Sequence, residues 1–418
     1  MEKLQRATDN TVKVKSDICL ILWLRSKNRF LRPSLFPNRP VIPVKKPEMS
    51  VYTLLLDFSV DPKNVKNESH LSLLSSNIEN VLRDYIGNLK LITTLSIAGG
   101  SLNIYSGDMG SVISLRIFDN GTITVNIEYL KGDDSDINIL TLECTKQIEQ
   151  KIYVTISCFR SKQFPPIKRG GSFDVYLTSS DDRLLEYDID SILFEERSPY
   201  QKVQVVHSKS LGNMLVLDDL QNISEADLIY TETLMLRGKE DYKDKEIVIL
   251  GGGDGALLYE LLKEQPKHVT MLEIDEVVMR ACKQHMRSIC GDVLDQKSTS
   301  NYQIIVGDCM KSLDQFVKED RKFDYVFGDL TDVPIADDSE SEIWNFVKKY
   351  LSLSFKILKP TGKFMSHGNG ACCSLALEKY ENYLATIDPP LVVNKCQAFI
   401  PSFMEFWVFY QIHFANKG

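Results

Sequence analysis

The most regular part of the chain is its carboxyl-terminal half, where short apolar runs alternate with stretches of helical spacing. The apolar runs predict strands over 246–250, 269–275, 302–308, 323–329 and 362–367. The stretches between them predict helices that end near 265, and helices over 276–289, 309–318, 340–358 and 374–386. Two further runs, 392–399 and 404–412, are again strand-like. This alternation is typical of a parallel α/β sheet, which binds ligands at the carboxyl ends of its strands.

The amino-terminal part has a different pattern, in which strands and helices are not alternated regularly. Apolar residues at helical spacing predict helices over 70–86 and 139–151. Strand-like runs lie at 52–58, 91–98, 114–118 and 122–129. We therefore expect a small α+β domain over 49–160. This domain contains no cluster of acidic residues or histidines, and its apolar residues are assigned to a hydrophobic core.

Two other segments set the domain boundaries. Residues 161–172 contain paired prolines and paired glycines, which predict a linker before a third domain over 173–415. That domain opens with short strands, and the runs 201–209 and 213–218 flank Leu211-Gly212 as a β-hairpin. Residues 1–48 are basic and rich in proline, and we expect a disordered extension there, with a targeting peptide as the alternative.

Charge and composition narrow the class of protein. Residues 1–48 carry eleven basic and four acidic residues, which leaves 38 basic and 53 acidic residues in 49–418. Such an acidic body attracts cations and repels nucleic acid. No apolar run approaches the roughly 20 residues that span a membrane. Nine cysteines without metal-binding spacing are typical of free thiols, so we expect a cytoplasmic protein without a metal site.

Carboxylates follow four successive strands of the predicted sheet. Asp254 follows the first strand, Glu273 and Asp275 end the second, Asp308 ends the third and Asp329 ends the fourth. Any one of them could simply cap the next helix. Because the carboxyl ends of parallel strands meet at one edge, four together predict a binding site.

The glycine-rich turn at 251–255 indicates the kind of ligand. Small residues there let the backbone approach a bound molecule, although such a turn fits dinucleotide and adenosyl sites alike. Glu273 lies where a carboxylate accepts hydrogen bonds from ribose. Asp308 has no role in a dinucleotide site but suits an adenine amino group. Asp254 would repel the carboxylate of S-adenosylmethionine and attract the bare ammonium of its decarboxylated form.

These motifs resemble the spermidine and spermine synthases, a family of polyamine aminopropyltransferases. The resemblance rests on Gly-Gly-Gly-Asp-Gly255, Leu-Glu-Ile-Asp275, Gly-Asp-Cys309 and Asp-Leu-Thr-Asp-Val-Pro334. Phe-Pro-Pro-Ile-Lys-Arg-Gly-Gly171 and Pro-Ser-Phe-Met-Glu-Phe-Trp-Val-Phe-Tyr410 are similar to the spermine synthase branch in animals. The family resemblance is strong over about residues 164–412, weak over 50–160 and absent over 1–48.

The resemblance implies a fold, a reaction and a set of site residues. The fold is a Rossmann-like S-adenosyl-binding sheet with an amino-terminal β-hairpin subdomain, preceded by an α+β dimerisation domain like S-adenosylmethionine decarboxylase. The reaction moves an aminopropyl group from decarboxylated S-adenosylmethionine, a co-substrate, to spermidine, with no cofactor and no metal. Asp329 is implied as the catalytic proton acceptor, and Phe403 and Glu405 as polyamine-binding residues. The implied donor-binding residues are Gln201, Tyr230, Asp254, Glu273, Asp308 and Cys309. The implied assembly is a homodimer, with no nucleic-acid or membrane partner.

The chain departs from the family pattern at two positions that concern the acceptor. Asp332 replaces an alanine of the spermine-type loop, where spermidine synthases carry an aspartate, and Phe403 replaces a tyrosine. Putrescine therefore stays open as the acceptor. A methyltransferase of the same fold and a non-catalytic relative also stay open as functions.

Overall fold

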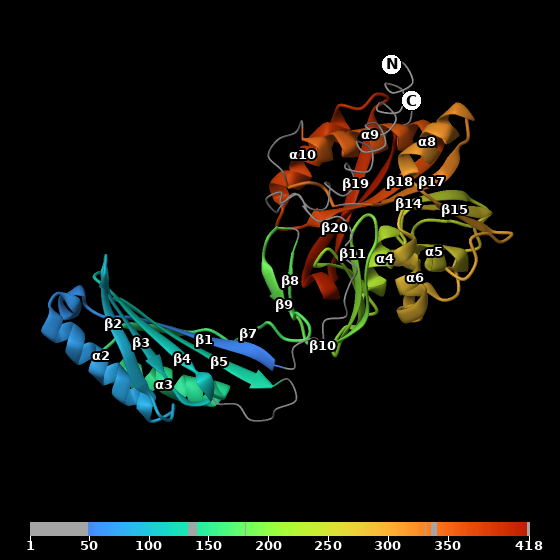
Figure 1. The fold of residues 1–418 in the computed structure, drawn as a ribbon. Helices are drawn as coiled ribbons and strands as arrows, with labels where there is room; N and C mark the ends of the chain where they lie inside the picture. The colour runs from blue at the N-terminus through green and yellow to red at the C-terminus, as the bar shows by residue number, and fades with distance from the viewer. Residues whose placement is uncertain (1–48, 133–139, 180, 331, 336–340, 416–418) are drawn as a thin grey trace, which may run out of the picture. The chain divides into compact units, whose positions relative to one another are not determined.

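The structure is a computed structural model that describes residues 49–132, 140–179, 181–330, 332–335 and 341–415. Its contacts divide these residues into two compact units, an amino-terminal unit (49–174) and a carboxyl-terminal unit (175–415), shown in Figure 1. The basic segment 1–48, for which the sequence predicted a disordered extension, lies outside the described residues. Within the described ranges, no helix is long and apolar enough to cross a membrane.

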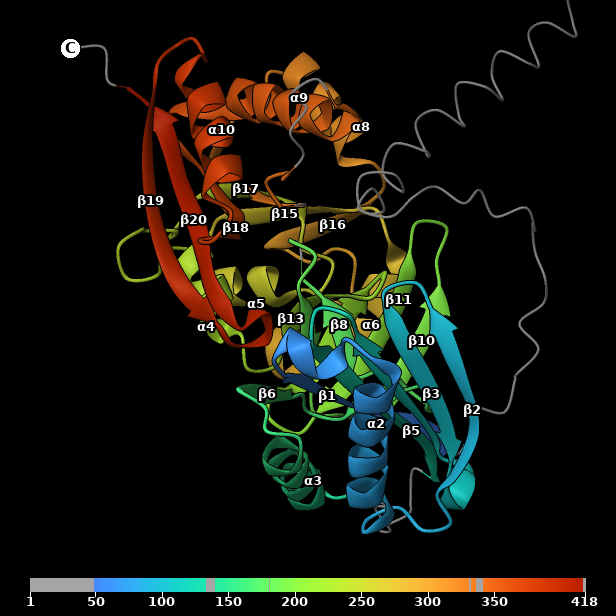
Figure 2. The same cartoon turned by 90° about the vertical axis from the view of Figure 1, so that its left-hand side faces the viewer.

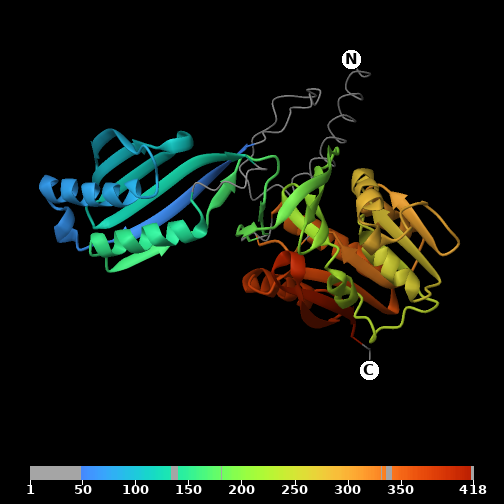
Figure 3. The same ribbon diagram turned by 90° about the horizontal axis from the view of Figure 1, so that it is seen from below.

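The amino-terminal unit is one antiparallel sheet with two helices on one face, as Figure 3 shows. Its helices are α2 (Glu68–Arg83) and α3 (Leu142–Thr155), whose first turns are capped by the Asn67 and Thr141 side chains. The sheet has the order β2-β3-β4-β5-β1-β6, with β7 also paired to β1. The strands are β1 (Met49–Ser59), β2 (Lys90–Ile97), β3 (Gly100–Ser106), β4 (Val112–Phe118), β5 (Thr122–Gly132), β6 (Arg160–Gln163) and β7 (Ile167–Arg169).

Alternation along the strands explains why the helices cover only one face. In β1, Leu54, Leu56 and Phe58 are buried, whereas the residues between them are partly exposed. The sequence missed β3, whose run Gly-Ser-Leu-Asn-Ile-Tyr-Ser mixes polar and apolar residues. The predicted linker 161–172 was wrong over part of its length, because β6 and β7 both pair with β1 there.

The carboxyl-terminal unit begins with two small antiparallel sheets. One is the hairpin of β8 (Tyr176–Thr178) and β9 (Leu184–Glu186). The other has the order β10-β11-β12-β13 and contains the hairpin predicted around Leu211-Gly212. Its strands are β10 (Ile189–Arg197), β11 (Lys202–Ser208), β12 (Gly212–Leu217) and β13 (Leu220–Ser224). Their apolar face, with Val203, Val205 and Leu215, packs against helix α6 (Glu276–His285).

A seven-stranded sheet of order β16-β15-β14-β17-β18-β20-β19 forms the centre of this unit. The strands are β14 (Glu246–Gly251), β15 (His268–Glu273), β16 (Tyr302–Val306), β17 (Phe323–Asp329), β18 (Leu358–Gly370), β19 (Leu391–Ile400) and β20 (Glu405–Phe414). The first five are parallel, as predicted, but β20 is antiparallel to β18 and to β19. The expectation of a parallel sheet is therefore wrong for β20, whereas β19 runs in the same direction as the five parallel strands. A three-residue turn (Pro401–Phe403) joins β19 directly to β20 and forces them to run antiparallel.

Helices cover both faces of this sheet, as Figure 2 shows. One face is covered by α8 (Cys309–Lys318), α9 (Glu342–Ile357) and α10 (Ser374–Ala385). The other face is covered by α4 (Leu228–Leu234) and α5 (Ala256–Lys263), and α6 and α7 (Arg287–Cys290) lie beside α5. The central strand β14 contributes side chains to the hydrophobic cores on both faces of the sheet. Val248 and Leu250 join the core under α8 and α9, whereas Ile247 and Ile249 join the core under α4 and α5.

The strand order places a natural ligand site. After β14 the chain moves to β15 and β16 on one side, and then returns to β17 on the other. Such a reversal leaves a crevice outside the carboxyl ends of the two central strands. Gly251 at the end of β14 pairs with Asp329 at the end of β17, so the glycine turn and Asp329 lie at this point.

Candidate active site

A cavity of about 790 Å³ lies at this reversal point. The structure brings all nine of the predicted site residues to its wall. They are Gln201, Tyr230, Asp254, Glu273, Asp308, Cys309, Asp329, Phe403 and Glu405. Residues more than 200 positions apart in the sequence therefore share one cavity of the carboxyl-terminal unit.

The glycine turn keeps the floor of the cavity open. Gly251 has a φ of 85°, and a Cβ atom there would lie 2.1 Å from the carbonyl oxygen of Asp329. A Cβ atom at Gly253 would lie 2.7 Å from the Glu273 carboxyl group. Any side chain at these positions would displace the two strand ends that carry the acids.

Asp254 lies at the start of α5 and faces the cavity. Its Oδ1 accepts a hydrogen bond of 2.8 Å from the backbone N–H of Ala256. The residue is only 8% exposed, and burial raises the pKa of its carboxyl group. Among the described residues, no lysine, arginine or histidine forms an ion pair with it. The carboxylate is therefore in an environment that a cationic ligand would stabilise.

Glu273 and Gln201 are held by a residue that sequence reasoning did not select. The Oε1 atom of Glu273 accepts a hydrogen bond from the backbone N–H of Asp275 (2.7 Å). Asp275 in turn caps α6 and accepts hydrogen bonds from Gln201 Nε2 (3.0 Å) and Ser198 Oγ (2.7 Å). Buried Asp275 thus joins the strand end to the segment before β11.

Asp308 and Cys309 lie where β16 gives way to α8. Asp308 is the N-cap of that helix, since its Oδ1 accepts a hydrogen bond of 2.9 Å from the backbone N–H of Met310. Burial raises the pKa of the Cys309 thiol to about 12, with a smaller contribution from Asp308. The thiol is neutral, so it contributes shape rather than charge. The two interpretations of the strand-end acids, helix cap and cavity wall, both apply to Asp308.

Asp329 is approached by Tyr230, whose hydroxyl donates a hydrogen bond of 3.0 Å to Asp329 Oδ1. Tyr230 is deeply buried, and burial together with the Asp329 carboxylate raises the pKa of its phenol. Its ring packs edge-on against Phe403 and Phe409, at centroid distances of 6.0 and 5.3 Å. The tyrosine is therefore a fixed donor that orients one oxygen of Asp329.

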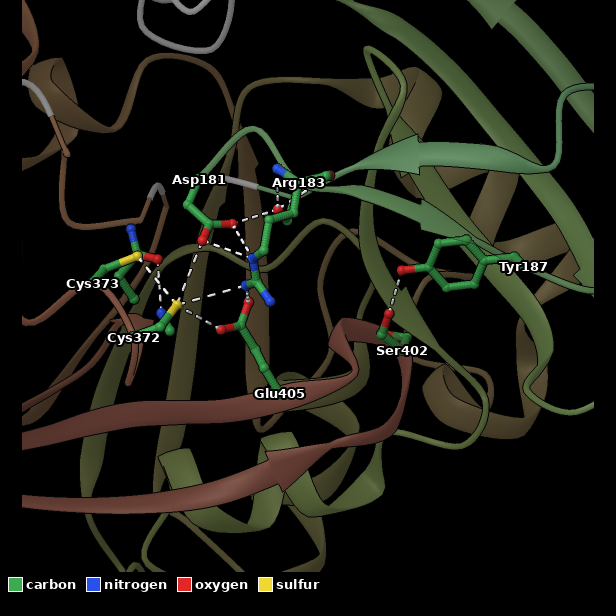
Figure 4. A network of polar contacts seen from close by, with 10 residues as sticks. Asp181, Arg183, Tyr187, Cys372, Cys373, Ser402 and Glu405 are labelled. Carbon is green, nitrogen blue, oxygen red and sulfur yellow. Dashed lines mark hydrogen bonds and ion pairs between the residues drawn. The ribbon is translucent and has the colours of Figure 1, made fainter. Parts of the chain in front are cut away.

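Glu405 begins β20, and its side chain is 11% exposed. Its Oε1 accepts a hydrogen bond of 2.8 Å from Arg183 Nη2, and the thiol of Cys372 lies 3.2 Å from its Oε2. Figure 4 shows Arg183 reaching between Glu405 and Asp181. The ring of Phe403 packs edge-on against the ring of Trp407, and the two ring centroids are 4.6 Å apart.

Sequence reasoning missed His367, which it left unassigned with the other histidines. In the structure its Nδ1 lies 3.5 Å from Asp332 Oδ1, and both residues line the cavity. His367 is 7% exposed and its ring centroid lies 6.0 Å from that of Tyr230. No local pattern could have revealed this pair, because strand pairing brings the two residues together from 35 positions apart.

The cavity wall is strongly acidic. Its only basic side chains among the described lining residues are Arg197 and His367. The carboxylates that line it are Asp182, Asp218, Asp219, Asp254, Glu273, Asp308, Asp329, Asp332 and Glu405. A cavity with nine carboxylates and one guanidinium favours a ligand with several positive charges.

Comparisons with known proteins agree with this chemistry. The Spermine/spermidine synthase domain matches residues 227–417, and the Spermidine synthase tetramerisation domain matches residues 175–225. The polyamine aminopropyltransferase of Sulfolobus acidocaldarius is 32% identical over 226 residues, which cover 53% of this chain and 71% of that protein. The chain belongs to the spermidine/spermine synthase family.

Another curated relative and a solved structure are also similar to the chain. The polyamine aminopropyltransferase of Sulfurisphaera tokodaii is 31% identical over 228 residues, covering 53% of this chain and 71% of that protein. The crystal structure of spermidine synthase from Thermotoga maritima is 16% identical, with a TM-score of 0.47, over 58% of this chain and 79% of that one. The two matched domains together lie within the carboxyl-terminal unit. The chain is thus a polyamine aminopropyltransferase by family, and the amino-terminal unit lies outside both matched domains.

Proposed function

We propose that the chain is a spermine synthase, which transfers an aminopropyl group from decarboxylated S-adenosylmethionine to spermidine. The products are spermine and 5′-methylthioadenosine. The observation that carries the proposal is the cavity with nine carboxylates and a single guanidinium. Both substrates are cations: the donor has a sulfonium and an ammonium, and the acceptor has several ammonium groups.

The donor is assigned to the glycine turn and the first three strand ends. Glu273 accepts hydrogen bonds from the ribose hydroxyls, Asp308 accepts one from the adenine amino group, and Cys309 packs beside the base. Gln201 and Tyr230 line the same space. Asp254 pairs with the donor ammonium. Intact S-adenosylmethionine would bring a second carboxylate against this buried acid, which argues against the methyltransferase alternative.

Asp329 is assigned as the proton acceptor. The nitrogen lone pair of the amine forms a bond to the propyl carbon of the donor while the carbon–sulfur bond breaks. The sulfur keeps the electron pair and leaves as neutral methylthioadenosine. The amine loses a proton to Asp329, whose other oxygen is held by Tyr230. No cofactor is required, and alignment of the two reacting atoms supplies the rest of the acceleration.

Glu405 is assigned to a distal ammonium of the acceptor. The strand that carries it lies two positions from the strand that ends at Asp329, a lateral separation of roughly 10 Å. A triamine can place one amine near Asp329 and another near Glu405, whereas a four-carbon diamine is too short to reach both. This favours spermidine over the alternative acceptor, putrescine. Phe403 forms part of the apolar wall beside the methylene chain.

The amino-terminal unit is assigned to dimer formation. One face of its sheet carries no helix, and it presents Val112 and Leu130, which are 48% and 45% exposed. A pair of such faces would cover this apolar surface in a homodimer. The proposal concerns the amino-terminal unit alone and is independent of the chemistry in the cavity.

One assay tests the proposed reaction and its acceptor. The protein is incubated with decarboxylated S-adenosylmethionine and equal concentrations of putrescine and spermidine, and the products are separated by chromatography. We expect spermine and an equimolar amount of methylthioadenosine. Spermidine as the main product would show that the acceptor is putrescine, and no methylthioadenosine with either amine would refute the transferase assignment.

A further inference from the structure

Beside the cavity, two adjacent cysteines meet an aspartate from a distant part of the chain. Cys372 and Cys373 lie between β18 and α10, and Asp181 lies in the segment between β8 and β9. One donor atom from each of these three side chains lies within 4.8 Å of the other two. Figure 4 shows the three side chains pointing toward one another, with Glu405 on the opposite side of Cys372. The sequence predicted no metal site, because these ligands follow no spacing motif.

We propose that Cys372, Cys373 and Asp181 form a binding site for a thiophilic divalent cation of the zinc class, next to Glu405, whose Oε2 lies 3.2 Å from Cys372 Sγ. The consequence for the enzyme, which rests on the proposed function, is that the charge of a bound ion competes with the polyamine ammonium for the neighbouring Glu405 carboxylate. The site would then inhibit acceptor binding without touching the donor.

The distances from Cys372 Sγ to its two partner ligands fit the edges of a tetrahedral site. With metal–sulfur and metal–oxygen bonds of usual length, the edges of a tetrahedron are roughly 3.8 Å between two sulfurs and roughly 3.6 Å between sulfur and oxygen. The two Sγ atoms are 3.8 Å apart, and Cys372 Sγ is 3.6 Å from Asp181 Oδ2. Glu405 Oε2 is 3.2 Å from Cys372 Sγ, but the glutamate lies outside this group of three ligands.

The donor set selects the kind of ion. Two thiols and one carboxylate match zinc and cadmium, whereas magnesium and calcium prefer oxygen alone. Binding must release the thiol protons to solvent as the two metal–sulfur bonds form. Affinity should therefore rise with pH.

Arg183 holds the carboxylates when no ion is bound. Its Nε donates to both oxygens of Asp181, at 2.8 and 2.7 Å, and its Nη2 donates to Glu405. A metal ion at this site and this guanidinium compete for Asp181. Removal of the guanidinium should therefore strengthen binding of the ion.

The test uses the full-length, reduced and chelator-treated protein, titrated with Cd²⁺ while the charge-transfer absorption of cadmium–thiolate bonds is recorded. We expect one ion per chain, displaced by Zn²⁺ and not by Mg²⁺. Cys372→Ser and Cys373→Ser should each weaken binding by at least about tenfold, and Arg183→Gln should strengthen it. Cys144→Ser, which removes a thiol from the amino-terminal unit, is the matched control and should bind as the wild type does. Unchanged affinity and absorption in the Cys372→Ser/Cys373→Ser double variant, with a normal circular dichroism spectrum, would overturn the site.

A second measurement separates the site from its effect on the reaction. Saturating Zn²⁺ should raise the spermidine KM of the wild type and leave the donor KM unchanged. In the Cys373→Ser variant, addition of Zn²⁺ should not change the spermidine KM. An ion that binds without changing the acceptor KM would refute the link to Glu405. If the chain transferred no aminopropyl group at all, the proposed function would fail, while the cadmium titration would still decide the site.

Discussion

Replacement of Glu405 by glutamine tests the assignment of the acceptor end of the cavity. The substitution keeps the shape of the side chain and removes its charge. A hydrogen bond to a charged group contributes about 1.5–3 kcal/mol, and about 1.4 kcal/mol corresponds to a tenfold change in affinity. The bound ammonium of spermidine would lose this contribution.

The structure requires one correction to this magnitude. In the ligand-free protein Glu405 pairs with Arg183, a side chain that is 44% exposed, so the ammonium must displace the guanidinium. An ion pair that exposed contributes only about 0.2–1 kcal/mol. The difference predicts that Glu405→Gln raises the spermidine KM by roughly 2- to 100-fold.

Steady-state kinetics with each substrate varied in turn measures this effect. The donor KM should stay unchanged, because Glu405 begins β20, whereas the acids assigned to the donor, Asp254, Glu273 and Asp308, lie at the ends of β14, β15 and β16. Arg183→Gln is the matched variant: it removes the competing cation and should lower the spermidine KM by up to about fivefold. An unchanged spermidine KM in a fully active Glu405→Gln enzyme would refute the assignment. An equal rise in both KM values would indicate a general structural defect instead.

Three other predictions concern separate parts of the chain. Asp329→Asn should lower kcat by at least about a hundredfold with little change in melting temperature; near-normal turnover would place proton acceptance elsewhere. Asp254→Asn should raise the donor KM and increase the free energy of unfolding at neutral pH. A buried acid whose pKa is higher in the folded than in the unfolded protein destabilises the fold at any pH above its unfolded pKa. Thermal melts across pH should show that this gain vanishes below both pKa values of Asp254, and a lower stability of the variant at neutral pH would contradict the reasoning. A chain that begins near residue 172 should sediment as a monomer, and a stable dimer at micromolar concentration would refute the assignment of the amino-terminal unit.

Much of the carboxyl-terminal unit could be predicted from local pattern. The strand 323–329 and the helix 309–318 coincide with β17 and α8, since buried strands and amphipathic helices differ clearly in their apolar spacing. The acids at the strand ends were found because parallel strands bring their carboxyl ends to one edge. The direction of β20 was not found, since apolar alternation reads the same for parallel and antiparallel strands.

What remained hidden depends on contacts between distant segments. Arg183 and Glu405 are separated by 222 positions, and Asp181 and Cys372 by 191. Nothing in the sequence distinguishes Arg183, Asp181 or Cys372, and the family resemblance implied a role for Glu405 but not its ion pair with Arg183. Asp275 was recognised as a strand-end acid but given no role in the site, because the hydrogen bonds that it accepts from Gln201 and Ser198 come from the distant loop between β10 and β11.

The backbone bonds of the strand-end acids have a kinetic consequence. Asp254 and Asp308 each bind a backbone N–H through one oxygen and so keep the other at a fixed place before any ligand arrives. Because these two side chains are already ordered, they lose little rotamer freedom when the donor binds, and the donor can associate quickly. The opposite end of the cavity is different, because Glu405 is occupied by Arg183 until another cation replaces it. The two substrates therefore encounter unequal barriers, and we expect an ordered reaction in which the nucleoside enters first and exchange of one cation for another limits entry of the polyamine.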